Sequence, residues 1–182
     1  MAYAGPSRYV SCAKDTTTQA GRASAALNRP HMNIETEIPV LQMVLRLGAA
    51  VLLGLVLGLE RELRGKAAGL RTHMLVSLGA ASFMLVGLEV MYATSSGDPS
   101  ARIDPTRIIE GVIGGIGFLG AGSIIRGNGN IEGITTGAGI WAAGSIGVAC
   151  GFGNLILAAM VTGFAVMIVV LLGFIERRAI RD

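Results

Sequence analysis

Five long apolar segments restrict this chain to a small set of folds. Each is about 17–23 residues long, close to the ~20 helical residues needed to cross ~30 Å of hydrocarbon. Membrane β-strands instead alternate polar and apolar residues over about ten positions, and these runs are continuous. The sequence therefore predicts an all-α membrane protein with five transmembrane helices, at Val40–Leu59, Leu70–Tyr92, Ile108–Ile125, Ile134–Cys150 and Leu155–Ile175.

The composition supports a lipid bilayer as the surroundings of these segments. Of 182 residues, 52% are hydrophobic and 15% are charged, whereas a soluble domain has about 25% charged residues. So few charges could not cover that much apolar surface in water. The net charge of +3 is too small to favour a nucleic-acid partner. The two cysteines, Cys12 and Cys150, form no metal-ligand pattern, and we expect neither a metal site nor a cofactor.

The distribution of Lys and Arg predicts the orientation of the helices. Eight of these residues follow the first, third and fifth segments, whereas the opposite short loops contain only Arg102 and Arg107. By the positive-inside rule the richer side is cytoplasmic, which predicts an N-terminus outside and a C-terminus in the cytoplasm. Basic residues before the first segment argue the other way. The eight residues are Arg61, Arg64, Lys66, Arg71, Arg126, Arg177, Arg178 and Arg181.

Residues 1–37 differ from the rest of the chain because they are polar and contain no apolar run. This composition predicts a disordered tail, followed by a five-helix domain over residues 38–182. An alternative is that translation begins at Met32, directly before the first apolar segment. The intact mass of the native protein distinguishes the two.

Glycines spaced four residues apart predict close packing between helices. Small residues on one helix face let two backbones approach, and packing of this kind replaces the hydrophobic drive that lipid does not supply. We favour this role over a pore-lining one. The pairs at this spacing are Gly54/Gly58, Gly111/Gly115 and Gly133/Gly137. The glycines assigned a structural role are Gly54, Gly58, Gly115, Gly117, Gly120 and Gly122. The same Gly115–Gly120 run matches G-x-G-x-x-G, but its place inside an apolar segment excludes a dinucleotide site.

The stretch from Gly58 to His73 is the most informative polar region. One interpretation is a topology loop whose cations lie at the headgroups. That interpretation does not explain the acidic residues among the cations, so a cluster that pairs across helices, or binds an ion or a partner, stays equally open. Thr72 is a candidate cap for the second helix. The candidate residues here are Glu60, Arg61, Glu62, Lys66, Arg71, Thr72 and His73.

Ionisable residues inside the apolar segments form a second group of candidates, because burying a charge in hydrocarbon is costly unless it is paired or hydrated. Arg46, Glu89 and Glu110 fall at a similar depth near the outer side. We expect Arg46 to pair with Glu110 or Glu89, although for Glu89 separate contact with the outer interface is the favoured interpretation. Asp104 or Thr106 suits the cap of the third helix.

The fourth segment opens with Thr135 and Thr136, which suit N-cap positions. The N–H groups at such a helix start could bind an anion, but simple capping is the favoured interpretation. Trp141, the one tryptophan, is expected to pack between helices with a partner for its N–H. His73 and Ser77 have no third group near in sequence, so no catalytic triad is predicted and we do not expect an enzyme.

Three motifs in order resemble the MgtC/SapB family of bacterial inner-membrane proteins. They are G-L-E-R-E-x-x-x-K-x-A-G-L-R-T-H at Gly58–His73, R-x-x-x-x-x-x-x-G-I-G-F-L-G-A-G at Arg107–Gly122, and G-x-T-T-x-x-x-x-W at Gly133–Trp141. The resemblance implies five helices, an outside N-terminus, and an association with magnesium limitation and with intracellular survival of pathogens. Many members have Gln at the position of Glu110, so a role carried over to that residue differs here.

The sequence and the resemblance together predict a non-enzymatic, multi-pass inner-membrane factor in magnesium or ion homeostasis and membrane energetics. We expect it to self-associate or to act through another membrane protein. The alternative is a small transporter or channel for Mg²⁺ or another cation. Against that alternative, Mg²⁺ sites use several oxygen ligands, and no predicted span carries two acidic residues on one face.

Overall fold

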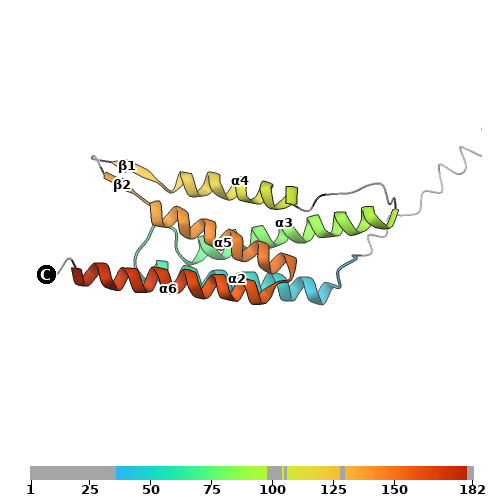
Figure 1. Ribbon diagram of the computed structural model, residues 1–182, viewed down its shortest axis with the longest axis horizontal. Helices are drawn as coiled ribbons and strands as arrows, with labels where there is room; N and C mark the ends of the chain where they lie inside the picture. The colour runs from blue at the N-terminus through green and yellow to red at the C-terminus, as the bar shows by residue number, and fades with distance from the viewer. Residues whose placement is uncertain (1–35, 98–103, 105, 128–129, 180–182) are drawn as a thin grey trace, which may run out of the picture. The chain divides into compact units, whose positions relative to one another are not determined.

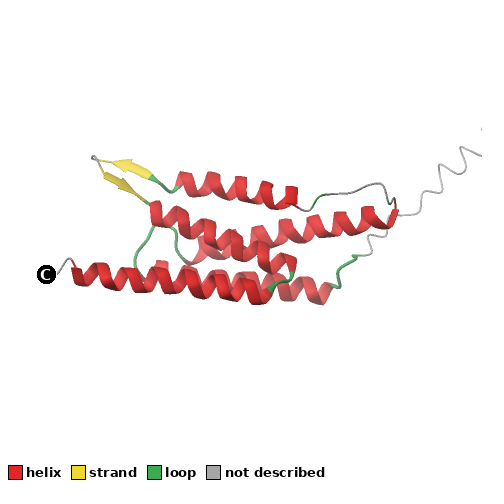
Figure 2. Ribbon diagram, in the orientation of Figure 1, coloured by secondary structure: helices red, strands yellow, loops and turns green. Residues whose placement is uncertain are grey.

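The computed structural model describes residues 36–97, 104, 106–127 and 130–179 (Figure 1). The predicted tail over residues 1–37, with the alternative start at Met32, lies outside this range except for its last two residues. The described residues form five helices and one short hairpin, and Figure 2 shows the helices and the two strands in different colours. They are α2 Val40–Leu63, α3 Leu70–Gly97, α4 Thr106–Gly122, β1 Ile125–Gly127, β2 Asn130–Glu132, α5 Ile134–Phe152 and α6 Leu155–Ala179.

Each helix lies where an apolar segment was predicted, so the described part of the chain is all-helical apart from the hairpin. Among the described residues, four helices are long and apolar enough to cross a membrane, namely α2, α3, α5 and α6. α4 has 17 residues, which span about 25 Å at 1.5 Å per residue, less than the ~30 Å of a hydrocarbon core.

The predicted third segment is too long at its carboxyl end. α4 ends at Gly122, and Ile125 instead begins β1, which pairs antiparallel with β2. Ile125 lies opposite Glu132 in this pairing. The hairpin lies directly before α5, so it places Gly133 and the first turn of α5 next to the end of α4.

α5 is the central helix of the bundle, with contacts to α2, α3, α4 and α6. In its apolar window 56% of the residues are buried, against 11% in the window of α6. The core around α5 consists mainly of small residues. Its fully buried members include Ala50, Ala81, Ala143, Ile146 and Ala158.

Several backbone contacts of this core involve glycine. A Cβ at Gly54 would lie 2.8 Å from the carbonyl oxygen of His73, and one at Gly58 would lie 2.8 Å from the Cα of Leu70. A Cβ at Gly147 would overlap the carbonyl oxygen of Ser77. α2 and α5 therefore approach α3 at the distance of backbone contact.

α4 begins with a side-chain cap. Asp104 Oδ1 accepts hydrogen bonds from the Thr106 hydroxyl at 2.7 Å and from the Thr106 N–H at 2.9 Å. These bonds stabilise the carboxylate and lower the pKa of Asp104 below its ordinary value. Of the two predicted candidates, Asp104 is the cap and Thr106 is the first helical residue.

Large apolar side chains cover the outside of the helices. Leu63, Phe118, Ile156 and Leu172 are examples, and Phe118 is 80% exposed. A soluble domain does not expose apolar surface over whole helix faces. This exterior agrees with lipid as the surrounding medium.

Candidate functional site

A buried polar cluster lies where the end of α2 meets the start of α3 and the start of α5. Its members are Arg61, His73, Ser77 and Thr136, and each is at most 4% exposed. They come from three helices, and α5 contributes its residue from a distant part of the sequence. The Gly58–His73 stretch is therefore more than a headgroup-facing loop, because two of its ionisable side chains, Arg61 and His73, are buried in the protein interior.

Arg61 makes the cross-helix contact in this cluster. Its Nη2 donates to Thr136 Oγ1 at 3.0 Å, and both side chains are buried. The Nε of Arg61 has no hydrogen-bond partner. A guanidinium is always charged in proteins, so this group places a positive charge in the interior beside α5.

His73 is fully buried and its orientation is fixed by one hydrogen bond. Its Nδ1 lies 2.8 Å from the Gly69 carbonyl oxygen. Because a carbonyl only accepts, Nδ1 carries the proton and donates. Nε2 then has no partner, and it faces Gly139, where a Cβ would lie 3.1 Å away. Gly139 thus leaves room for the ring against α5.

Ser77, one helical turn after His73, is a further buried polar residue whose Oγ has no partner. The sequence placed it four residues from His73 but gave no reason to expect it in the same buried cluster. The spacing of four residues, which puts both side chains on one face of α3, was the one sequence feature that linked Ser77 to His73.

The acidic residues of the stretch stabilise the connection between α2 and α3. Glu60 forms an ion pair with Arg64, one helical turn later. Glu62 Oε2 accepts from the N–H of Leu70 at 3.0 Å. The prediction that Thr72 caps this helix is wrong, because Thr72 is the third residue of α3 and Glu62 bonds the first N–H.

The predicted caps at the start of α5 are also wrong. Gly133 occupies the N-cap position with φ 91°, and no side chain caps the helix. Thr136 is committed to Arg61 instead, and Thr135 is exposed. Only glycine fits at 133, because the backbone is left-handed and a Cβ would overlap the Ser123 carbonyl oxygen.

A cavity of about 1110 Å³ opens beside this helix start. Arg61 and Lys66 line it from the α2 side, and Thr135 and Thr136 line it from α5. Glu132 and Ser123 border it near the hairpin. Arg71, in contrast, is exposed and does not line the cavity.

The predicted pairing of Arg46 is wrong. Its Nη1 donates to the carbonyl oxygen of Gly151 at 3.1 Å, and its Nη2 donates to Gln42 Oε1 at 3.4 Å. The carboxylate of Glu89 accepts the N–H groups of Glu37 and Ile38, at 3.0 and 2.8 Å, and so holds the segment before α2. Both ionisable side chains therefore bond to backbone groups, and Arg46 bonds to Gln42 as well.

Trp141 and Glu110 lie at the surface of the single chain. Trp141 is 51% exposed, so the prediction that it packs between helices is wrong. It borders a second groove, of about 350 Å³, between α4, α5 and the start of α6. Glu110 is exposed on α4.

The glycines of α4 divide into two groups. Gly120 contacts α5, where a Cβ would lie 3.4 Å from the Gly137 carbonyl oxygen. At Gly115, Gly117 and Gly122 a Cβ would meet nothing within 4 Å, so the expected packing inside the chain is wrong for these three.

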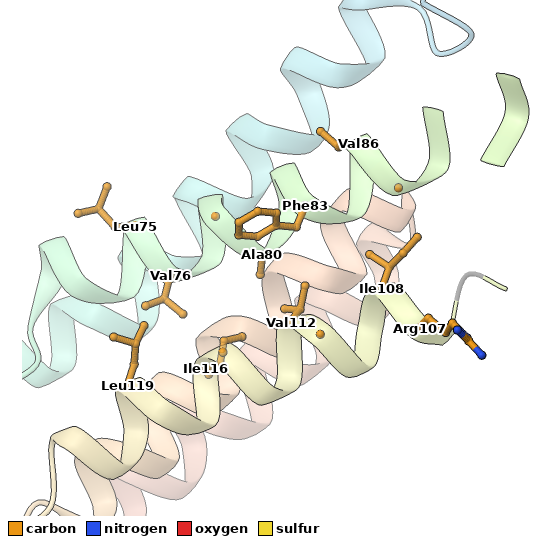
Figure 3. Close-up of a pocket in the computed structure, with 14 residues that line it drawn as sticks. Leu75, Val76, Ala80, Phe83, Val86, Arg107, Ile108, Val112, Ile116 and Leu119 are labelled. Carbon is orange, nitrogen blue, oxygen red and sulfur yellow. The ribbon is translucent and has the colours of Figure 1, made fainter. Parts of the chain in front are cut away.

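An apolar groove of about 670 Å³ separates α4 from α3, with Arg107 at one end (Figure 3).

The donors for a metal ion are sparse. Among the described residues, no group of three or more His, Cys, Asp or Glu side chains gathers in one place. Cys150 is a free, buried cysteine in the core around α5.

The helices and the apolar exterior define a multi-pass helical membrane protein. The chain belongs to the MgtC family, whose model matches residues 47–178. No solved structure matches the chain.

Three relatives are each 42% identical to this chain. "Putative magnesium transporter YhiD" of Escherichia coli (strain K12) aligns over 62% of this chain and 52% of its own length. "Protein MgtC" of Brucella abortus (strain 2308) aligns over 69% and 49%, and "Protein MgtC" of Salmonella typhimurium (strain LT2) over 66% and 48%. The chain thus spans about half the length of the relatives it matches.

Proposed function

We propose that this chain is a non-enzymatic inner-membrane factor that supports ion homeostasis and membrane energetics when Mg²⁺ is limiting. In a pathogenic bacterium the proposed factor also contributes to virulence. The observation that carries the proposal is the match of residues 47–178 to the MgtC family. That range contains the buried cluster of Arg61, His73, Ser77 and Thr136. The name of the Escherichia coli K12 relative, "Putative magnesium transporter YhiD", supports the connection to magnesium.

The proposed topology has five spans, an outside N-terminus and a cytoplasmic C-terminus. The excess of Lys and Arg on one side of the spans supports this orientation. In this proposal α4 crosses the membrane in addition to α2, α3, α5 and α6. Because α4 is short, its carboxyl end, next to the hairpin, lies in the membrane interface. The cavity beside α5 then faces the cytoplasm.

The factor acts, in this proposal, by binding a second copy or another membrane protein through α4. Supporting this, Gly111, Gly115 and Gly122 of α4 are exposed, and a Cβ at any of them would meet no other part of the chain within 4 Å. Glycine faces allow close approach of a further transmembrane helix. The apolar residues beside them, including Phe118, are exposed as well.

A small Mg²⁺ or other cation transporter is the second candidate. The observation that favours it is the name of the Escherichia coli K12 relative. The donor set of the described residues does not favour it, because Mg²⁺ binding uses carboxylates and other oxygen ligands around retained waters.

Growth under Mg²⁺ limitation tests the leading proposal. The chain is expressed in a bacterium that lacks its own MgtC-family protein, and growth rate and membrane potential are followed at micromolar Mg²⁺. We expect rescue by the wild type, reduced rescue by Arg61→Lys, which keeps the charge but not the two-pronged guanidinium geometry, and full rescue by Arg126→Gln. Immunoblots of membrane fractions establish that the variants are present in equal amounts.

Purified protein in liposomes separates the two candidates. An entrapped Mg²⁺ indicator is followed after external Mg²⁺ is added. The leading proposal expects influx equal to that of protein-free vesicles. Saturable influx that Arg61→Lys abolishes would replace the leading proposal with the transporter.

Cysteine crosslinking tests the role of α4. In a Cys12→Ser background, Phe118→Cys on α4 is compared with Phe164→Cys on α6, since both positions are exposed. We expect short crosslinkers in native membranes to capture a second copy or a membrane protein at position 118. Equal products at both positions would show random collision and remove α4 as the interface.

A further inference from the structure

The cavity beside the start of α5 combines three sources of positive potential. Arg61 and Lys66 line it as cations. The third source is the first turn of α5, because a helix start carries about half a positive charge and N–H groups without intrahelical acceptors. α5 has 19 residues, long enough to develop this dipole.

No side chain of the described residues accepts a hydrogen bond from the N–H groups in the first turn of α5. Gly133, at the N-cap, has no side chain, and no other side chain caps the helix. The hydroxyl of Thr136, which would suit this task, accepts from Arg61 instead. Thr135 borders the cavity and is exposed, so its hydroxyl is available to a ligand.

Arg61 is a buried cation at the edge of this cavity. It is 2% exposed, lines the cavity, and its Nε has no partner. A buried cation at the positive end of a helix is unfavourable on two grounds, desolvation and repulsion by the dipole. An anion in the cavity would relieve both.

The carboxylates nearby do not neutralise this charge directly. Glu60 attracts Arg61, but its carboxylate forms an ion pair with Arg64, which in turn repels Arg61. Glu132 borders the cavity and is exposed. Among the described residues, no ion pair joins Arg61 or Lys66 to a carboxylate.

We propose that this cavity binds a phosphate oxyanion, held by Arg61, Lys66 and the N–H groups at the start of α5. Arginine, lysine and helix starts are the usual donors to phosphate in proteins. The oxyanion has two sources, a free phosphate or the headgroup of an anionic phospholipid. The inference goes beyond the proposed function, since anion binding can fail while growth at low Mg²⁺ is still supported.

Thermal unfolding tests the free-phosphate source. The full chain, purified in detergent and freed of lipid, is titrated with inorganic phosphate against chloride at equal ionic strength. We expect a saturable rise in Tm with phosphate, because a ligand that binds only the folded state stabilises it. Lys66→Gln should weaken the apparent affinity about fivefold or more, and Glu132→Gln should strengthen it. Arg126→Gln is the matched control, because Arg126 is a nearby exposed cation that does not line the cavity.

Hydrogen exchange in nanodiscs tests the lipid source. Amide exchange at residues 134–136 is compared in phosphatidylglycerol and phosphatidylcholine discs without added phosphate. Slower exchange in phosphatidylglycerol, lost in Lys66→Gln and kept in Arg126→Gln, assigns the site to the lipid headgroup. All these variants lie at exposed positions, so loss of folding is not expected to obscure the result.

The inference is overturned if neither phosphate nor phosphatidylglycerol changes Tm or exchange at these residues. It is also overturned if chloride acts as strongly as phosphate, or if Arg126→Gln weakens binding as much as Lys66→Gln. The last result would show attraction to surface charge rather than binding in the cavity.

Discussion

The hydroxyl of Thr136 accepts a hydrogen bond from the buried guanidinium of Arg61, so removing this hydroxyl should change the stability of the fold. Thr136→Val keeps the shape of the side chain but leaves Arg61 Nη2 without its partner. We expect the free energy of unfolding to fall by about 1–2 kcal/mol, since hydrogen bonds to charged groups are stronger than neutral ones but helix-to-helix bonds in membranes are modest. The measurement is unfolding in mild detergent, followed by circular dichroism.

Thr135→Val is the control for this residue-scale prediction. It makes the same chemical change one position earlier, at an exposed side chain with no bond to Arg61. Its effect should stay within about 0.5 kcal/mol, as for most surface substitutions. Equal losses in the two variants would mean that the Arg61–Thr136 bond adds nothing to stability.

Some single-residue roles were accessible from the sequence and some were not. Acidic residues interleaved with cations drew attention to the stretch that contains Arg61 and His73, and the structure buries both side chains. Their partners were not accessible. Arg61 and Thr136 lie 75 residues apart, and the register in which α2 and α5 pack decides that they meet.

At the scale of elements, the junction of α2 and α3 depends on a reciprocal fit between Glu62 and Gly69. Glu62 Oε2 accepts the Leu70 N–H, and a Cβ at Gly69 would overlap that same oxygen. Glu62→Ala and Gly69→Ala should each lower the free energy of unfolding by about 0.5–2 kcal/mol, because each removes the cap of α3. The double variant should lose no more than the larger single loss, and a double-mutant cycle measures this.

Glu62→Gln is the matched variant for this pair, because its amide oxygen still accepts a hydrogen bond. It should lose less stability than Glu62→Ala. Strictly additive losses in the double variant would contradict the capping role and indicate two unrelated effects.

Helix ends and the hairpin show where prediction from hydropathy stops. Apolar runs located all five helices, but α2 continues past Leu59 to Leu63, and Arg61 of this extension enters the polar cluster. The hairpin was missed. The Asn-Gly pair at 128–129 in the sequence is a recognised turn signal, and reading Ile125 as part of an apolar run concealed it.

At the scale of the whole molecule, α5 is held on several sides and α4 on few. The sequence showed glycines in both helices and could not separate them, because the spacing of small residues is the same whichever surface they face. The structure separates them. Gly144, Gly147 and Gly151 of α5 each face atoms of α3 or α4 at closer than contact distance for a Cβ, whereas Gly111 and Gly115 of α4 face open space.

The same substitution should therefore have opposite consequences in the two helices. Gly147→Ala forces a methyl group onto the Ser77 carbonyl and should lower stability by about 1–3 kcal/mol, the usual cost of overpacking. Gly115→Ala meets no atom of the chain and should leave the Tm of the detergent-purified single chain unchanged or raise it, because alanine favours the helix.

If α4 binds a second copy or a partner through its glycine face, Gly115→Ala should at the same time reduce crosslinking at position 118 in native membranes. A loss of crosslinking without a loss of Tm assigns the α4 glycines to association between molecules. A loss of Tm larger than that of Gly147→Ala would instead place them inside the folded chain, against the arrangement described here.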